Sequence, residues 1–292
     1  MSAPQPGIFA LGTLAHSYVE LDLVDGASPA DLVRAIAGLE EPRTTMGGVN
    51  LVSGFRPEVW GGPAPAGLHG FSEPVVGPDG FTMPATQHDA VLWVSGGSYD
   101  VVFDAVIGML AALEGVAVLA HEVPGWTYHR DRDLTGFIDG TENDSVLVSP
   151  AEVLVPDGSP GAGGSVLLLQ QWAHEARAWS ALSTRRQEAA MGRTKADSVE
   201  LEDKPESSHV ARTDQEEFGQ IFRRNTPYGS VADHGTMFVG FAADQGPLAR
   251  MLDSMAGVGG PRDELTRYTT PLTGGYYFVP SVEDLNARGG SS

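Results

Sequence analysis

The stretch Tyr18-Val-Glu-Leu-Asp-Leu-Val24 alternates apolar and polar residues, which is typical of a half-buried β-strand. It closes a strand-like region that begins near Ile8. Ser28 then offers a helix N-cap, and Pro29 suits the first helical position. We therefore predict a strand that leads directly into a helix ending near Leu39.

The elements that follow complete the order βαββαβ. We expect strands at Val49–Ser53, Ala90–Val94 and Val116–Val123. A helix should begin after Ser98, with its apolar residues on one face and Gly115 just past its end. This order is that of a ferredoxin-like unit.

The rest of the chain repeats this order less clearly. Strands are predicted at Ser165–Trp172, Gln220–Arg223, Thr236–Phe241 and Tyr276–Pro280, and helices at Trp179–Met191 and Pro247–Met255. The pattern predicts an α+β fold in which a ferredoxin-like unit is duplicated and the paired antiparallel sheets form a barrel-like body. We expect an N-terminal half over 1–124, a connection over 125–164 and a C-terminal half over 165–292.

Composition excludes several classes of function. The 292 residues include 38 acidic and 18 basic side chains, a net charge of −20, which argues against partners such as nucleic acids and anionic membranes. The absence of cysteine excludes disulfides, thiolate metal ligands and cysteine nucleophiles. The most apolar stretch, Val101–Leu119, is interrupted by Asp104 and Glu114, and no secretory signal is visible. We expect a cytoplasmic protein.

Three short segments carry residues suited to chemistry. Gly136-Phe-Ile-Asp139-Gly140-Thr-Glu-Asn143 sets an acid between two glycines in the connection. His209-Val-Ala-Arg212-Thr-Asp214 and Arg223-Arg-Asn225-Thr-Pro227-Tyr228-Gly229 follow in the second half. On a strand, Arg223 and Asn225 share a face. From the residues alone, an ordinary Asp-Gly turn and exposed strand charge remain open alternatives.

Taken together, these segments resemble the dye-decolorizing peroxidases. The first is similar to the family's G-x-x-D-G motif, and the other two to the stretch that carries its proximal histidine and distal arginine. The ending Leu265–Ser281 resembles the family as well. The resemblance runs in order over nearly the whole chain, and the Arg-x-Asn arrangement points to the bacterial B-type subgroup. Asp144 departs from the expected proline, where we expect a change in the loop without loss of chemistry.

The resemblance implies one haem b per chain, bound in the second half. His209 would be the proximal ligand of the ferric iron. Its other ring N–H needs an acceptor that fixes the tautomer, for which Asp263 is the candidate and Glu264 its rival. Arg212 would be available to a haem propionate.

The resemblance also implies the distal side of the haem. Asp139 would carry a proton between the two peroxide oxygens as a general acid–base. Arg223, which stays cationic and would also contact the haem, would stabilise the negative charge that develops on the peroxide. Asn225 would hold a water molecule or a peroxide oxygen.

The implied activity is that of a haem-dependent peroxidase that reduces hydrogen peroxide to water and oxidises bulky organic reductants, such as dyes and phenolics, by one-electron steps. We expect such electron donors to act at the surface through aromatic side chains. We also expect a homo-oligomer, either a dimer or a hexamer. Alternatives are a non-catalytic haem carrier or sensor, and chlorite-dismutase-like or coproheme-handling proteins, which lack the arrangement Gly136-x-x-Asp139-Gly140.

Overall fold

The N-terminal part of the molecule is a four-stranded antiparallel sheet covered by helices. The computed structural model describes residues 2–39, 48–129 and 132–289. The elements up to residue 126 are η1 (Pro6–Phe9), β1 (Ala15–Leu23), α1 (Pro29–Ala37), β2 (Val49–Phe55), α2 (Pro57–Trp60), β3 (Val75–Val76), β4 (Thr82–Met83), β5 (Ala90–Gly96), α3 (Tyr99–Ala112) and β6 (Ala117–Trp126). The long strands lie in the order β2-β5-β1-β6. The predicted strands and helices of this part are confirmed, including the cap, where Ser28 Oγ accepts a hydrogen bond from the Asp31 N–H at 3.2 Å.

The C-terminal part follows the same strand order. Its elements are α4 (Ser149–Val153), β7 (Ser165–His174), α5 (Ala176–Ser180), α6 (Thr184–Met191), α7 (His209–Arg212), α8 (Gln215–Phe218), β8 (Phe222–Arg223), β9 (Thr226–Gly229), β10 (His234–Ala242), α9 (Gln245–Ala256), η2 (Glu264–Arg267), β11 (Thr269–Pro271), β12 (Gly275–Val279) and α10 (Val282–Gly289). β12 pairs with β7, β7 with β10, and β10 with both β8 and β9. In each part the first strand therefore lies between the fourth and the third.

The prediction of one helix over Trp179–Met191 is wrong. The structure has two short helices, α5 and α6, separated by a break at Ala181–Ser183. Ser183 has extended backbone angles and begins the second helix. Gln187 Nε2 donates to the carbonyl of Trp179 across the break at 2.9 Å. This hydrogen bond links the two short helices, and the periodicity of apolar residues does not predict it.

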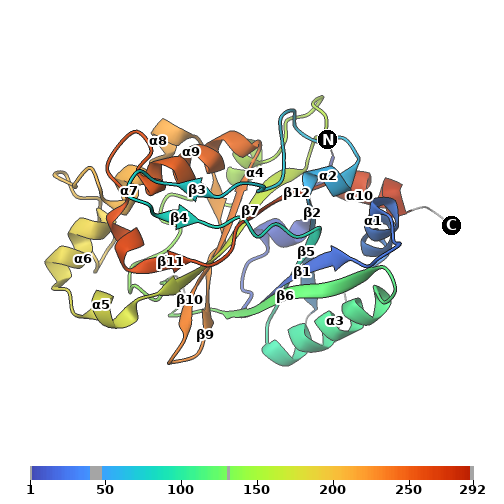
Figure 1. Cartoon of the computed structure of the whole chain (residues 1–292), viewed down its shortest axis with the longest axis horizontal. Coiled ribbons are helices and arrows are strands. Elements are labelled where there is room, and N and C mark those ends of the chain that lie inside the picture. Colours follow the sequence, from blue (N-terminus) through green and yellow to red (C-terminus); the bar gives the residue numbers. More distant parts are fainter. Residues whose placement is uncertain (1, 40–47, 130–131, 290–292) are drawn as a thin grey trace.

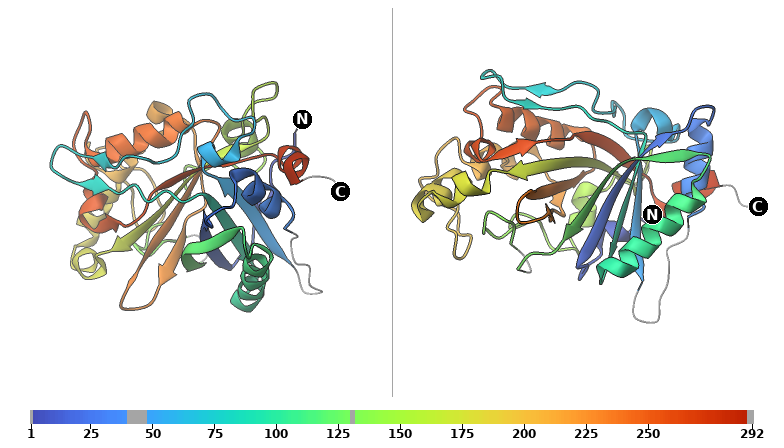
Figure 2. Two further views of the ribbon diagram at one scale, coloured as in Figure 1. Left: turned by 45° about the vertical axis from the view of Figure 1, so that its right-hand side comes forward. Right: turned by 60° about the horizontal axis from the view of Figure 1, so that its bottom comes forward.

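The strands close into an antiparallel barrel, as predicted. The two parts join where β12 pairs with β2 at Phe278 and Phe55, and where β6 pairs with β9 at Gly125 and Tyr228. Helix α3 packs outside β1 and β5, whereas α9 packs outside β10 on the other part of the sheet (Figures 1 and 2). Within the described ranges, no helix combines the length and apolar character needed to cross a membrane.

The barrel interior holds a buried histidine whose protonation should limit acid stability. His16 is 3 % exposed, and its Nδ1 accepts a hydrogen bond from Trp93 Nε1 at 3.1 Å. Burial, followed by the charge of Arg224, lowers the pKa of His16 from 6.5 to about 4. Between these two values the unfolded chain binds a proton at His16 and the folded chain does not. Stability is therefore lost as the pH falls through this window.

We expect His16 to remove about 2 kcal/mol from the free energy of unfolding between about pH 7.5 and about pH 5. The variant His16→Gln keeps an acceptor for Trp93 but does not titrate, so its loss over the same interval should be smaller by that amount. Urea unfolding of both proteins at both pH values measures the difference. Equal losses in the two proteins would show that His16 is not the group responsible.

Candidate active site

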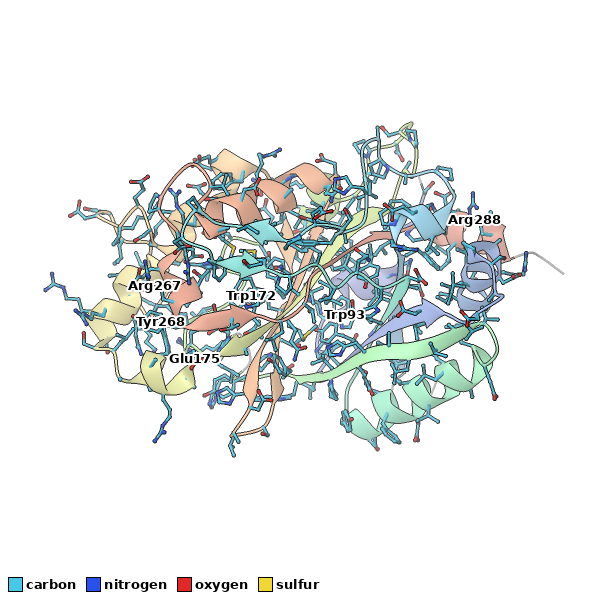
Figure 3. All side chains as sticks on the ribbon, viewed as in Figure 1. Trp93, Trp172, Glu175, Arg267, Tyr268 and Arg288 are labelled. Atoms are coloured by element: carbon cyan, nitrogen blue, oxygen red, sulfur yellow. The ribbon has the colours of Figure 1, made fainter. Side chains whose placement is uncertain are left out.

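A cavity lies against the outer face of β7 and β10. Its volume is about 1170 Å³, which includes the space at its open mouth. Strand β7 alternates here, because Leu168, Gln170 and Trp172 face the cavity while Leu167 and Leu169 face the barrel interior. Trp172 marks this part of the molecule in Figure 3. Most of the wall is apolar, with further contributions from Phe238, Leu248, Met251, Leu252, Met255 and Leu265. The cavity therefore suits a large, mainly apolar ligand.

His209 lines one side of the cavity and is oriented by a buried carboxylate. It begins the short helix α7, whose N-cap is Ser208. His209 Nδ1 lies 2.7 Å from Oδ2 of Asp263, a residue that is fully buried. Burial is the largest single effect and lowers the pKa of His209, but the charge and the hydrogen bond of Asp263, with the charge of Glu142, together raise it above its usual value. The carboxylate fixes the proton on Nδ1 and leaves Nε2 as the ring nitrogen free to bind a ligand.

The structure also shows why Glu264 does not take that position. Its carboxylate binds Arg267 Nε at 2.9 Å, and its side chain lies on the surface. Asp263 Oδ1 instead accepts the N–H of Leu265 at 2.9 Å, which holds the carboxylate that faces His209.

Asp139 lines the cavity and is fixed through one of its oxygens. Its Oδ1 accepts the Gly140 N–H at 2.7 Å and Asn225 Nδ2 at 3.3 Å. Gly140 has φ of +68°, a conformation that favours glycine at this turn. Asn225 in turn accepts the Val239 N–H on its Oδ1 at 3.1 Å. Two hydrogen-bond donors on one oxygen leave the other oxygen of Asp139 available to a ligand.

Arg223 is held by its backbone and presents an unpaired guanidinium to the cavity. The side chain of Asn143 bonds both backbone groups of Arg223: Nδ2 donates to the carbonyl at 2.8 Å, and Oδ1 accepts the N–H at 2.9 Å. In the part of the chain that the structure describes, the Arg223 guanidinium has no hydrogen-bond or ion-pair partner, and its buried Nε is unsatisfied. Asp139 and Arg223 thus lie in one cavity without forming an ion pair, and each is positioned separately.

A second acid faces the same cavity. Asp133 accepts the N–H of Thr135 at 2.8 Å and its hydroxyl at 2.5 Å, both on Oδ1. Burial, followed by the charge of Asp139, raises the pKa of Asp133 to about 6. Asp133 belongs to the segment Asp131–Asn143 that carries the G-x-x-D-G motif, but it precedes the motif, and the sequence alone did not predict that it faces the cavity.

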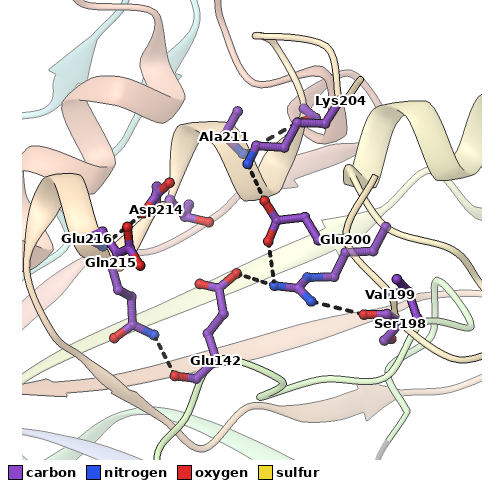
Figure 4. Close-up of polar contacts among 12 residues, drawn as sticks. Glu142, Ser198, Val199, Glu200, Lys204, Ala211, Asp214, Gln215 and Glu216 are labelled. Atoms are coloured by element: carbon purple, nitrogen blue, oxygen red, sulfur yellow. Dashed lines mark hydrogen bonds and ion pairs between the residues drawn. The ribbon is translucent and has the colours of Figure 1, made fainter. Parts of the chain in front are cut away.

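A second cation at the cavity wall, besides Arg223, is Arg193, whereas the predicted Arg212 does not line the cavity. Arg193 Nη2 binds Glu142 at 2.8 Å and Glu200 at 3.3 Å, and Glu200 also binds Lys204 (Figure 4). The buried Nε of Arg193 has no partner. Arg212 is not among the cavity-lining residues, and its ion-pair partner is Glu206, at 3.9 Å.

Comparison with known proteins identifies the family. The model of the Dyp-type peroxidase C-terminal family matches residues 130–284. The dye-decolorizing peroxidase of Mycolicibacterium paratuberculosis is 34 % identical over 97 % of this chain and 85 % of the relative. That of Rhodococcus erythropolis is also 34 % identical, over 97 % of this chain and 88 % of the relative.

Solved structures agree with the sequence relatives. A variant of DypB from Rhodococcus jostii RHA1, in complex with heme, has a TM-score of 0.89 and 31 % identity, with 98 % of each chain covered. The dye-decolorizing protein from V. cholerae has a TM-score of 0.87 and 31 % identity, covering 97 % of this chain and 99 % of that one. The likeness to DypB agrees with the expected B-type subgroup. The chain belongs to the dye-decolorizing peroxidase family.

Proposed function

We propose that this peroxidase binds one haem b per chain in the cavity, reduces hydrogen peroxide to water, and oxidises bulky organic reductants by one-electron steps. The observation that carries the proposal is the hydrogen bond of 2.7 Å between His209 and Asp263. His209 lines the same cavity as Asp139 and Arg223. A histidine whose second nitrogen binds a carboxylate is the arrangement that metal-ligating imidazoles adopt.

The residues present fit such a group. The apolar wall suits a macrocycle, and buried polar atoms without partners remain at the cavity on Arg193, Ser198, Gln170 and Arg223. Among the described residues the buried Nε atoms of both Arg193 and Arg212 lack a partner, but only Arg193 lines the cavity, so it is the candidate to receive a propionate. In this proposal the C-terminal half, 165–292, supplies the iron ligand, and the connection, 125–164, supplies the acid.

When bound, the haem supplies the iron at which peroxide accepts electrons. His209 would hold that iron through its ring nitrogen Nε2, and Asp263 would strengthen it as a ligand by accepting the hydrogen bond from Nδ1. Asp139 takes a proton from one peroxide oxygen and returns it to the other, acting through the oxygen that Gly140 and Asn225 leave free. Arg223 stabilises the negative charge on the departing oxygen.

A haem titration followed by absorption spectroscopy tests the proposal. We expect a Soret band that saturates at one haem per chain, changes on addition of one equivalent of hydrogen peroxide, and returns when a dye is oxidised. A band that forms but never responds to peroxide would instead favour a carrier or sensor. No haem uptake would reject the proposal altogether.

A further inference from the structure

The barrel interior contains a tyrosine and a carboxyl group that the proposed function does not use. Tyr277 OH donates to Glu20 Oε1 at 2.5 Å, and the exposed fractions of the two residues are 0 % and 2 %. Among the described residues, no other tyrosine hydroxyl bonds to a carboxylate, and Glu20 forms no ion pair with lysine or arginine. A buried acid without a cation weakens a fold unless a hydrogen bond compensates for it, so this pair is an unusual element of the core.

Tyr277 lies directly behind the cavity wall. On β12, Tyr276 pairs with Leu168 of β7, a residue that lines the cavity, and Tyr277 pairs with Leu167. The side chains of neighbouring strand residues point to opposite faces, so Tyr276 packs on the cavity side and Tyr277 in the barrel interior. Tyr277 therefore lies on the opposite face of the sheet from the cavity, next to a strand that lines it.

The surroundings of Tyr277 favour its oxidation over that of the other interior aromatics. Removing an electron from a phenol is easiest when a base takes its proton in the same step, and Glu20 is such a base. Trp93 is surrounded differently, because the guanidinium of Arg224 lies 5.3 Å above its ring and would repel a positive charge there. Tyr18 OH bonds the hydroxyl of Thr226, and Tyr228 lies near the side chain of Gln171, so among the described residues neither has a carboxylate as its hydrogen-bond partner.

Several groups control whether Glu20 is ready to accept a proton. Burial, the largest effect, raises the pKa of Glu20, and Asp22 adds to this, while Tyr277, His88 and His121 act in the opposite direction. Burial also raises the pKa of Tyr277 well above 10, so its hydroxyl keeps its proton at rest. Because only the ionised form of Glu20 can accept the proton, the yield of this step is expected to rise with pH.

We propose that Tyr277 is a redox-active residue that gives an electron to the peroxide-oxidised centre while its phenolic proton moves to Glu20. The inference rests on the proposed function, which supplies the oxidant. The O–H bond of Tyr277 breaks and an O–H bond forms on Glu20, leaving a neutral tyrosyl radical and a neutral carboxylic acid. The oxidised centre is reduced by one equivalent. An electron from an organic reductant later restores the phenol, and the proton returns from Glu20.

Freeze-quench electron paramagnetic resonance of the haem-loaded protein tests this step. The samples receive one equivalent of hydrogen peroxide and no reductant, at mildly alkaline pH. We expect a tyrosyl signal in the wild type that falls at least roughly tenfold in Tyr277→Phe and in Glu20→Gln. Glu20→Gln keeps an oxygen that accepts the hydrogen bond but cannot take the proton, so it separates the chemistry from packing. Tyr276→Phe is the matched control, one residue away on the other face, and should keep the signal.

Absorption spectra of the same samples separate this inference from the proposed function. If the Soret band forms and responds to peroxide while Tyr277→Phe keeps the full radical signal, Tyr277 is not the site and the proposed function stands. If Glu20→Gln keeps the full signal, the proton transfer to Glu20 is refuted. If no haem binds, the proposed function fails and the inference fails with it.

Discussion

Replacing His209 by alanine should weaken haem binding by more than roughly 100-fold, since loss of an outer partner of a metal ligand alone costs about 10–100-fold. The reason is geometric. His209 offers Nε2 to the cavity because its Nδ1 is occupied by Asp263 at 2.7 Å. The apolar wall would still attract a macrocycle, but without a ligand for the iron. Haem titration monitored at the Soret band gives the affinity directly.

Two further variants make this result specific. His174 also lines the cavity and is half-buried, but its Nε2 is bonded to Thr236 Oγ1 at 3.1 Å, so His174→Ala should keep a normal Soret band. Asp263→Asn should fall between the two, with about a 10–100-fold loss, because the imidazole keeps its place but loses the charged acceptor. A Soret band that survives in His209→Ala and disappears in His174→Ala would show that His174, and not His209, is the ligand.

The sequence predicts well those features that depend on short-range pattern. Alternation and capping locate β1 and α1, and the resemblance to the family selects Asp139, His209 and Arg223, all of which line the cavity. These signals are readable because strand faces repeat every two residues and because helix caps need particular side chains.

Features that depend on contacts between residues far apart in the sequence could not be predicted from it. Asn143 belongs to the motif, but its bonds to the backbone of Arg223 join residues 80 positions apart. Arg193 reaches Glu142 across 51 positions, and no local pattern distinguishes it from Arg212. Near the break in the helix before Thr184, Trp179 Nε1 donates to the carbonyl of Thr135, 44 positions away. The sequence therefore predicted which residues line the cavity, whereas the structure shows what holds them in place.

Replacing Arg223 by glutamine should lower the second-order rate constant for reaction with hydrogen peroxide by roughly 100–1000-fold, the usual effect of removing a donor that stabilises a developing oxyanion. Asp139→Asn should lower it by roughly 100–10,000-fold, since the amide cannot carry the proton. Stopped-flow absorption of the haem-loaded proteins measures both constants. Arg212→Gln removes the same charge outside the cavity lining and should leave the rate constant unchanged.

The double variant decides whether the two groups act in one step. Asp139 is held by Gly140 and Asn225, and Arg223 by the side chain of Asn143, so either side chain can be replaced without removing the hydrogen bonds that position the other. If proton transfer and charge stabilisation occur together as the O–O bond breaks, the double variant should be impaired far less than the product of the two single effects. If the two single effects multiply fully in the double variant, the acid and the cation contribute independently of each other.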